Sequence, residues 1–128
     1  NKKDIYKKDY MKKSLIILIS FFFFKDAQAK TERYYQDIHC DLVNGATEVR
    51  NDDSTRVDCL TKAEAIEYDH AKKWAECLGQ ALYYGAKQNK EPHCLLIGSK
   101  EDYDKYSKRI EYVVKYYNLP LKINWIEK

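Results

Sequence analysis

Apolar residues recur along the chain with two periods, one typical of helices and one typical of strands. Helical spacing predicts helices over residues 31–43, 71–87 and 102–117, and the first carries apolar residues at Tyr34, Tyr35, Ile38 and Leu42. Five short strands are expected at residues 47–50, 55–60, 65–69, 93–98 and 121–126. The order α-β-β-β-α-β-α-β predicts an α/β domain with a mixed central sheet flanked by helices.

The helix expected over residues 71–87 has two stripes of different character. Its apolar stripe is formed by Ala71, Trp74, Ala75, Leu78, Ala81, Leu82 and Gly85. A second stripe at helical spacing is formed by Lys73, Cys77, Gln80 and Tyr84. Because the second stripe lies away from the apolar one, it is either a solvated face or part of a site.

The first 29 residues have the layout of an export signal. Met11 to Lys13 supplies positive charge, Leu15 to Phe24 is apolar, and Ala29 ends a small-residue cleavage motif. The apolar run falls well short of the roughly 20 residues that span a bilayer. We therefore expect residues 1–10 to be upstream read-through, 11–29 to be a cleaved signal peptide, and 30–128 to be a domain of a periplasmic or secreted bacterial protein without a membrane anchor.

Charge has to be judged without that signal. Seven of the 23 Lys and Arg residues and three of the 20 Asp and Glu residues lie in the first 29 positions, which leaves 16 basic and 17 acidic residues. The near-neutral remainder gives no support for a broad basic surface that binds nucleic acid. The sequence also lacks a Gly-rich phosphate loop, a Ser-His-Asp arrangement and a Cys-x-x-Cys redox motif.

All four cysteines, Cys40, Cys59, Cys77 and Cys94, lie in the expected domain. An even number of cysteines in an exported chain predicts two disulfides, for which three connectivities are open. A zinc site is the competing interpretation, but the gaps are long and lack the usual close spacing of zinc ligands.

A tight turn at residues 61–64 would bring acidic residues of two strands together. With Leu60 facing Ala65 across the hairpin, Asp58 lies opposite Glu67, and Arg56 lies opposite Asp69. Strand alternation then predicts an ionic face with Arg56, Asp58, Glu67 and Asp69, and a core face with Val57, Cys59, Ile66 and Tyr68. Opposed carboxylates destabilise a sheet unless a cation lies between them, and a divalent metal is the simplest such cation.

Other arrangements of the same residues remain open. Arg56 could pair with Asp69, or Asp69 could cap the helix that starts at Ala71. Asp58 and Glu67 could equally be solvated on an open face of the sheet.

At these residues the chain resembles the PD-(D/E)xK phosphodiesterase superfamily, which has the restriction-endonuclease-like fold. The likeness rests on "RVDCLT" from Arg56, the E-x-D element at Glu67, "KWAE" from Lys73 and "GQALYY" from Gly79, and it is closest to a group of small bacterial proteins. It covers nearly the whole domain and implies an α-β-β-β-α-β core.

The resemblance also implies a site. Asp58 and Glu67 would hold Mg²⁺ or Mn²⁺ that activates water for phosphodiester cleavage, and Glu32 and Glu48 are weaker candidate ligands. Gln80 and Tyr84 match the Q-x-x-x-Y element of RecB-like members, so the resemblance implies that these two residues bind substrate. One departure is that Asp69 occupies the place of the motif lysine.

In some members of the superfamily the lysine has moved to the next helix, which makes Lys73, or else Lys72, the candidate here. The similar proteins also carry cysteines at the positions of Cys40 and Cys59, so the resemblance implies a bond between these two and leaves Cys77 to pair with Cys94.

Two functions follow from these expectations. The first is an exported metal-dependent nuclease that acts on DNA or RNA and uses Asp58, Glu67, Asp69 and Lys73. The alternative is a catalytically inactive secreted binding module of the same fold, which the missing motif lysine and the near-neutral charge favour.

Overall fold

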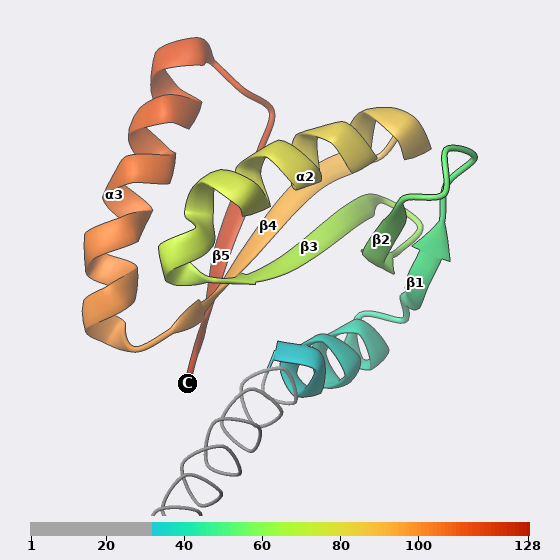
Figure 1. The fold of residues 1–128 in the computed structure, drawn as a ribbon, viewed down its shortest axis with the longest axis horizontal. Helices are drawn as coiled ribbons and strands as arrows, with labels where there is room; N and C mark the ends of the chain where they lie inside the picture. The colour runs from blue at the N-terminus through green and yellow to red at the C-terminus, as the bar shows by residue number, and fades with distance from the viewer. Residues whose placement is uncertain (1–31) are drawn as a thin grey trace, which may run out of the picture. The chain divides into compact units, whose positions relative to one another are not determined.

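The computed structural model describes residues 32–128 (Figure 1). The expected upstream segment, the signal peptide and the helix cap at Thr31 lie outside these residues. Among the described residues, no helix combines the length and the apolar character needed to cross a bilayer.

The elements follow the expected order with boundaries shifted by a few residues. A first helix spans residues 32–42 (cyan in Figure 1). Strands β1 (Ala46–Arg50), β2 (Arg56–Leu60) and β3 (Glu64–His70) follow it. A short 3₁₀ turn, η1 (Ala71–Lys73), leads into helix α2 (Trp74–Gln88). Strand β4 (Glu91–Gly98), helix α3 (Lys100–Tyr117) and strand β5 (Lys122–Glu127) complete the chain.

The five strands form one mixed, open sheet in the order β1-β2-β3-β4-β5. The first three strands are antiparallel neighbours, whereas β3, β4 and β5 run parallel to one another. The parallel pairs are joined by α2 and α3, since parallel strands need crossover connections. The predicted mixed sheet with flanking helices is thus present.

Helices cover the sheet on both faces. The first helix packs through Cys40 against Ile66, Tyr68, Leu95 and Ile97 of β3 and β4. Helices α2 and α3 pack on the opposite face, where Cys77, Ala81 and Ile110 contact Cys94 and Leu96. Strand β3 is therefore buried from both sides, with all residues from Ala65 to His70 shielded from solvent. This burial contradicts the prediction that one face of the β2–β3 hairpin is an ionic face outside the core.

The register of the β2–β3 hairpin is the predicted one, with Leu60 paired to Ala65 and Cys59 to Ile66. The alternation of faces along β2, however, differs from the predicted one. Val57 packs with Ala65 and Tyr84 in a separate apolar cluster, while Cys59 packs with the first helix. The strand therefore changes its relation to the two faces at the intervening residue, Asp58.

Two disulfides tie the helices to the sheet, and no free cysteine remains among the described residues. Cys40 of the first helix bonds Cys59 of β2, and Cys77 of α2 bonds Cys94 of β4. This is the pairing that the family resemblance implied, and it is compatible with an exported protein. All four sulfur-bearing side chains are fully buried, although Cys77 was expected on a stripe away from the apolar one.

Gly45 offers a test of how closely the first helix is held to the sheet. A methyl group at this position would overlap the Sγ atoms of Cys40 and Cys59, so Gly45→Ala must displace the disulfide or the chain. We expect a loss of about 1 to 3 kcal/mol in the free energy of unfolding, measured with urea. Gly79→Ala is the control: nothing lies within 4 Å of its added methyl, and a gain of about 1 kcal/mol is expected. Equal stability of the two variants would contradict this packing.

Candidate functional site

The sheet is interrupted on both sides of Asp58. The β1–β2 ladder skips the position where Glu48 would face Asp58, and the β2–β3 ladder ends at Cys59 and Ile66. Glu48 has φ of 56°, a left-handed conformation that a regular strand cannot accommodate. Because buried backbone groups need partners, the N–H and C=O of Asp58 have to be satisfied in another way.

Side chains take the place of the missing ladder bonds. The backbone N–H of Asp58 donates to Oε1 of Glu67 at 3.1 Å, and the N–H of Tyr68 donates to Oδ2 of Asp58 at 3.0 Å. The carbonyl of Asp58 accepts from Nε2 of Gln36 at 2.9 Å. The two predicted metal ligands are thus brought together, each binding the backbone of the other strand.

Burial changes the protonation of this pair. Glu67 is 2% exposed and Asp58 is partly buried. Loss of solvent raises the pKa of Glu67, and the neighbouring charge of Asp58 raises it further. Loss of solvent also raises the pKa of Asp58, while the N–H of Tyr68 opposes the shift. Burial and mutual repulsion thus disfavour full ionisation of the two neighbouring carboxyl groups.

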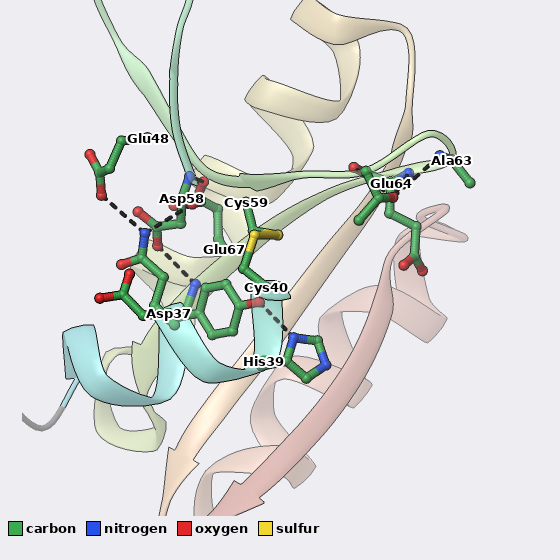
Figure 2. Close-up of a disulfide and its surroundings, with 12 residues drawn as sticks. Asp37, His39, Cys40, Glu48, Asp58, Cys59, Ala63, Glu64 and Glu67 are labelled. Carbon is green, nitrogen blue, oxygen red and sulfur yellow. Dashed lines mark hydrogen bonds between the residues drawn. A yellow bond between two sulfur atoms is a disulfide. The ribbon is translucent and has the colours of Figure 1, made fainter. Parts of the chain in front are cut away.

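Figure 2 shows Asp58 and Glu67 side by side next to the Cys40–Cys59 disulfide, with Glu48 on the far side of Asp58. Oε1 of Glu48 accepts from Nε2 of Gln36 at 3.0 Å and from Nη1 of Arg33 at 3.1 Å. Oε2 of Glu48 lies 3.5 Å from Nη1 of Arg56. These contacts hold Glu48 in its strained conformation and leave its carboxylate paired with cations.

The other predicted acidic residues lie beside basic side chains near the carboxyl pair. Oε2 of Glu32 lies 3.5 Å from Nε2 of His70. Oδ1 of Asp69, on β3, lies 3.7 Å from Nζ of Lys73, four residues further along the chain. Burial raises the pKa of Asp69 to about 7, with the charge of Lys73 acting in the opposite direction.

These partners answer two alternatives left open by the sequence. Arg56 pairs with Glu48 rather than with Asp69. Asp69 provides no helix cap, since its Oδ1 accepts from the adjacent N–H of His70 at 2.9 Å and the turn at Ala71 has no side-chain cap.

The second stripe of α2 faces the sheet. Cys77 and Tyr84 are buried, Gln80 is half-buried, and only Lys73 is about half exposed, at 48%. Burial raises the pKa of the Tyr84 hydroxyl, and the charges of Glu67 and Asp58 add to the shift, so this tyrosine lies close to the pair. The interpretation of this stripe as a solvated face is therefore wrong. It forms the wall that covers the carboxyl pair.

The donor set of the pair fits a hard divalent cation. Glu67 Oε1 and Asp58 Oδ2 accept from backbone N–H groups, and an ion would bind the carboxyl oxygens in place of the contact between the two groups. Among residues 32–128, no group of three His, Cys, Asp or Glu side chains is arranged to hold a metal. A cation here would have two protein ligands, and Mg²⁺ typically uses one or two together with water and substrate phosphate.

Gln36 is a site residue that the apolar pattern missed. Its side chain is 5% exposed and connects the backbone of Asp58 to the carboxylate of Glu48. The signal for it was its spacing, because Glu32, Gln36 and Cys40 recur every four residues on one face of the first helix. Since Cys40 bonds the residue next to Asp58, that face had to meet the site.

Comparison of the chain with protein-family models, with curated proteins and with solved structures gives no match. The function therefore has to be inferred from the residues and their geometry.

The raised pKa of Glu67 predicts an unusual dependence of stability on pH. The pKa of Glu67 is higher in the folded than in the unfolded chain, so its contribution to stability is present in acid and is lost as pH rises. Glu67→Gln mimics the protonated form, and in the presence of EDTA it should be more stable than the wild type at pH 8 by at least about 1 kcal/mol.

Urea unfolding from pH 5 to pH 8 checks this, with Glu76→Gln as the control at an exposed position of α2. The account is contradicted if Glu67→Gln is the less stable protein at pH 8 and its stability curve runs parallel to the wild-type curve.

Proposed function

We propose that this protein is an exported metal-dependent nuclease with a restriction-endonuclease-like core. The element order from the first helix to β4 is α-β-β-β-α-β, and the sheet is mixed, as such a core requires. The single observation that carries the proposal is the buried carboxyl pair of Asp58 and Glu67. Burial and mutual repulsion raise the pKa of both neighbouring carboxyl groups, and a divalent cation between them would offset that repulsion.

In this proposal Asp58 and Glu67 bind Mg²⁺ or Mn²⁺. The bound ion supplies Lewis-acid chemistry, polarising a phosphodiester and lowering the pKa of water. The structural hydrogen bonds of the two carboxyl groups hold them in place without a ligand, so the site is preorganised. Glu48 keeps its ion pairs nearby, and the charges of Glu32 and Glu48 both raise the pKa of Asp58.

Lys73 takes the role of the missing motif lysine. Its ammonium is about half exposed, and its position beside Asp69 holds it at the edge of the buried carboxylates. There it can orient an attacking water or stabilise charge on a phosphate oxygen. Gln80 and Tyr84 lie on the same stripe and are assigned to substrate contact.

The inactive binding module remains the second candidate because of one specific observation. Both carboxyl groups already have a structural role, since they complete the hydrogen bonding of two separated strands. A protein that retained them for this reason alone would also tolerate aspartate in place of the motif lysine.

Asp58→Asn separates these two functions, because asparagine can still accept the N–H of Tyr68 while losing the charge that binds a metal. We expect it to lower Mg²⁺- or Mn²⁺-dependent cleavage of polynucleotides about 100-fold or more. The rise of Tm with added Mg²⁺ or Mn²⁺ should disappear as well. Asp41→Asn, at an exposed position of the first helix, is the control. Undiminished cleavage by purified Asp58→Asn protein would exclude the proposed mechanism.

Lys73→Ala tests the relocated lysine. We expect it to lower kcat about 100-fold with a small effect on stability, since Lys73 is half exposed even though its partner Asp69 is buried. Lys72→Ala, at the adjacent exposed position, is the control and should retain most of the activity. The assignment fails if Lys72→Ala is the more damaging of the two.

A further inference from the structure

The C-terminal two thirds of α3 carries a cationic and aromatic surface away from the carboxyl pair. Lys105 to Tyr117 contains four basic residues and one acidic residue, although the expected domain as a whole is close to neutral. At 100° per residue, one outward face of the helix collects Lys105, Lys108, Arg109, Tyr112, Lys115 and Tyr116. All six are exposed, and we call them the α3 face.

The tyrosines of this face are available for stacking. Tyr112 and Tyr116 are each 70% exposed, and their rings stack on one another with centroids 6.2 Å apart and planes inclined by 20°. Tyr117 is 67% exposed and meets Tyr116 edge to face. Leaving large aromatic rings in water is unfavourable unless a partner covers them.

The cations lie where a charged partner chain would run beside those rings. Lys105 and Arg109 are one turn apart, and both lie over the ring of Tyr106 at 5.2 and 5.3 Å from its centroid. Lys108 and Lys115 flank the tyrosines on one side of the face. Alternation of flat aromatic rings with cations is what a single-stranded polynucleotide requires, because its bases stack and its phosphates need positive charge.

We propose that the α3 face binds single-stranded nucleic acid, with bases stacked on Tyr112 and Tyr116 and phosphates held by the surrounding Lys and Arg side chains. The inference rests on the proposed function in that it names the substrate class and its docking surface. A lipid surface is less well matched. Helices that bind a lipid surface insert Leu, Phe or Trp into it, whereas the exposed large apolar side chains of α3 are all tyrosines.

The test is fluorescence anisotropy of a labelled oligothymidylate with the purified protein in EDTA, so that no metal-dependent cleavage takes place. Removing two stacking rings in the double variant Tyr112→Ala, Tyr116→Ala should raise the Kd for the oligonucleotide about 25-fold or more. Tyr34→Ala removes a tyrosine of similar exposure, 61%, from the first helix and should bind like the wild type. Unchanged Kd in the double variant overturns the proposal.

Salt and charge provide a second measurement. With three to four phosphates neutralised, raising the salt from about 50 to about 200 mM should weaken wild-type binding roughly 20- to 50-fold. The double variant Lys108→Gln, Arg109→Gln should flatten this dependence, whereas Lys62→Gln, on the β2–β3 turn, should not. Sedimentation with anionic phospholipid vesicles but no binding of the oligonucleotide would also overturn the proposal.

Asp58→Asn separates this proposal from the nuclease proposal. It should bind the oligonucleotide with wild-type affinity, because the α3 face does not include the carboxyl pair. Binding by the wild type without any cleavage would refute the nuclease and leave the α3 face supported. If the tyrosine double variant cleaves polynucleotides and binds the oligonucleotide with wild-type affinity, the nuclease is supported and the α3 face is refuted.

Discussion

The structure around the candidate site depends on how the backbone of Asp58 is satisfied. The regular pairing is interrupted at this residue toward β1, where Glu48 is left-handed, and the ladder toward β3 stops at Cys59. Side chains from the first helix and from β3 fill the break, through Gln36 and Glu67. A buried N–H or C=O without a partner costs about 1 to 3 kcal/mol, so these polar side chains are as necessary to the fold as the apolar core is.

This requirement explains which faces of the helices are buried. The first helix turns its Gln36 and Cys40 inward, while Tyr34, Ile38 and Leu42 are 61%, 45% and 75% exposed. Of the four apolar residues expected to face the core, only Tyr35 packs against it. The helix is rotated because Gln36 has to reach Asp58 and Cys40 has to reach Cys59. In α2, the Cys77–Cys94 disulfide likewise fixes the orientation of the helix, so that the face with Cys77 is directed toward the sheet.

The sequence predicted the elements, the hairpin register and the meeting of Asp58 with Glu67, because each of these depends on local periodicity and one tight turn. Burial of Glu67 and Asp69 could not be predicted, since it depends on what packs over β3 from both sides. The contacts of Glu48 with Arg33 and Gln36 join residues at least 12 positions apart, and its left-handed backbone has no sequence signal in glutamate. Hydrophobic spacing failed for the first helix because it counts apolar residues and ignores hydrogen bonds that only polar ones can make.

The same carboxyl pair therefore serves the fold and, in our proposal, the chemistry. Its oxygens accept from backbone N–H groups, and a bound cation would offset the burial and the repulsion that raise the pKa of Glu67. The most direct measurement is anomalous scattering from crystals soaked in Mn²⁺ at pH 8. We predict a peak at coordination distance from one oxygen of Asp58 and one of Glu67. Absence of a peak there, with both carboxyl groups still bound to the backbone, would contradict the metal site and leave the pair a purely structural element.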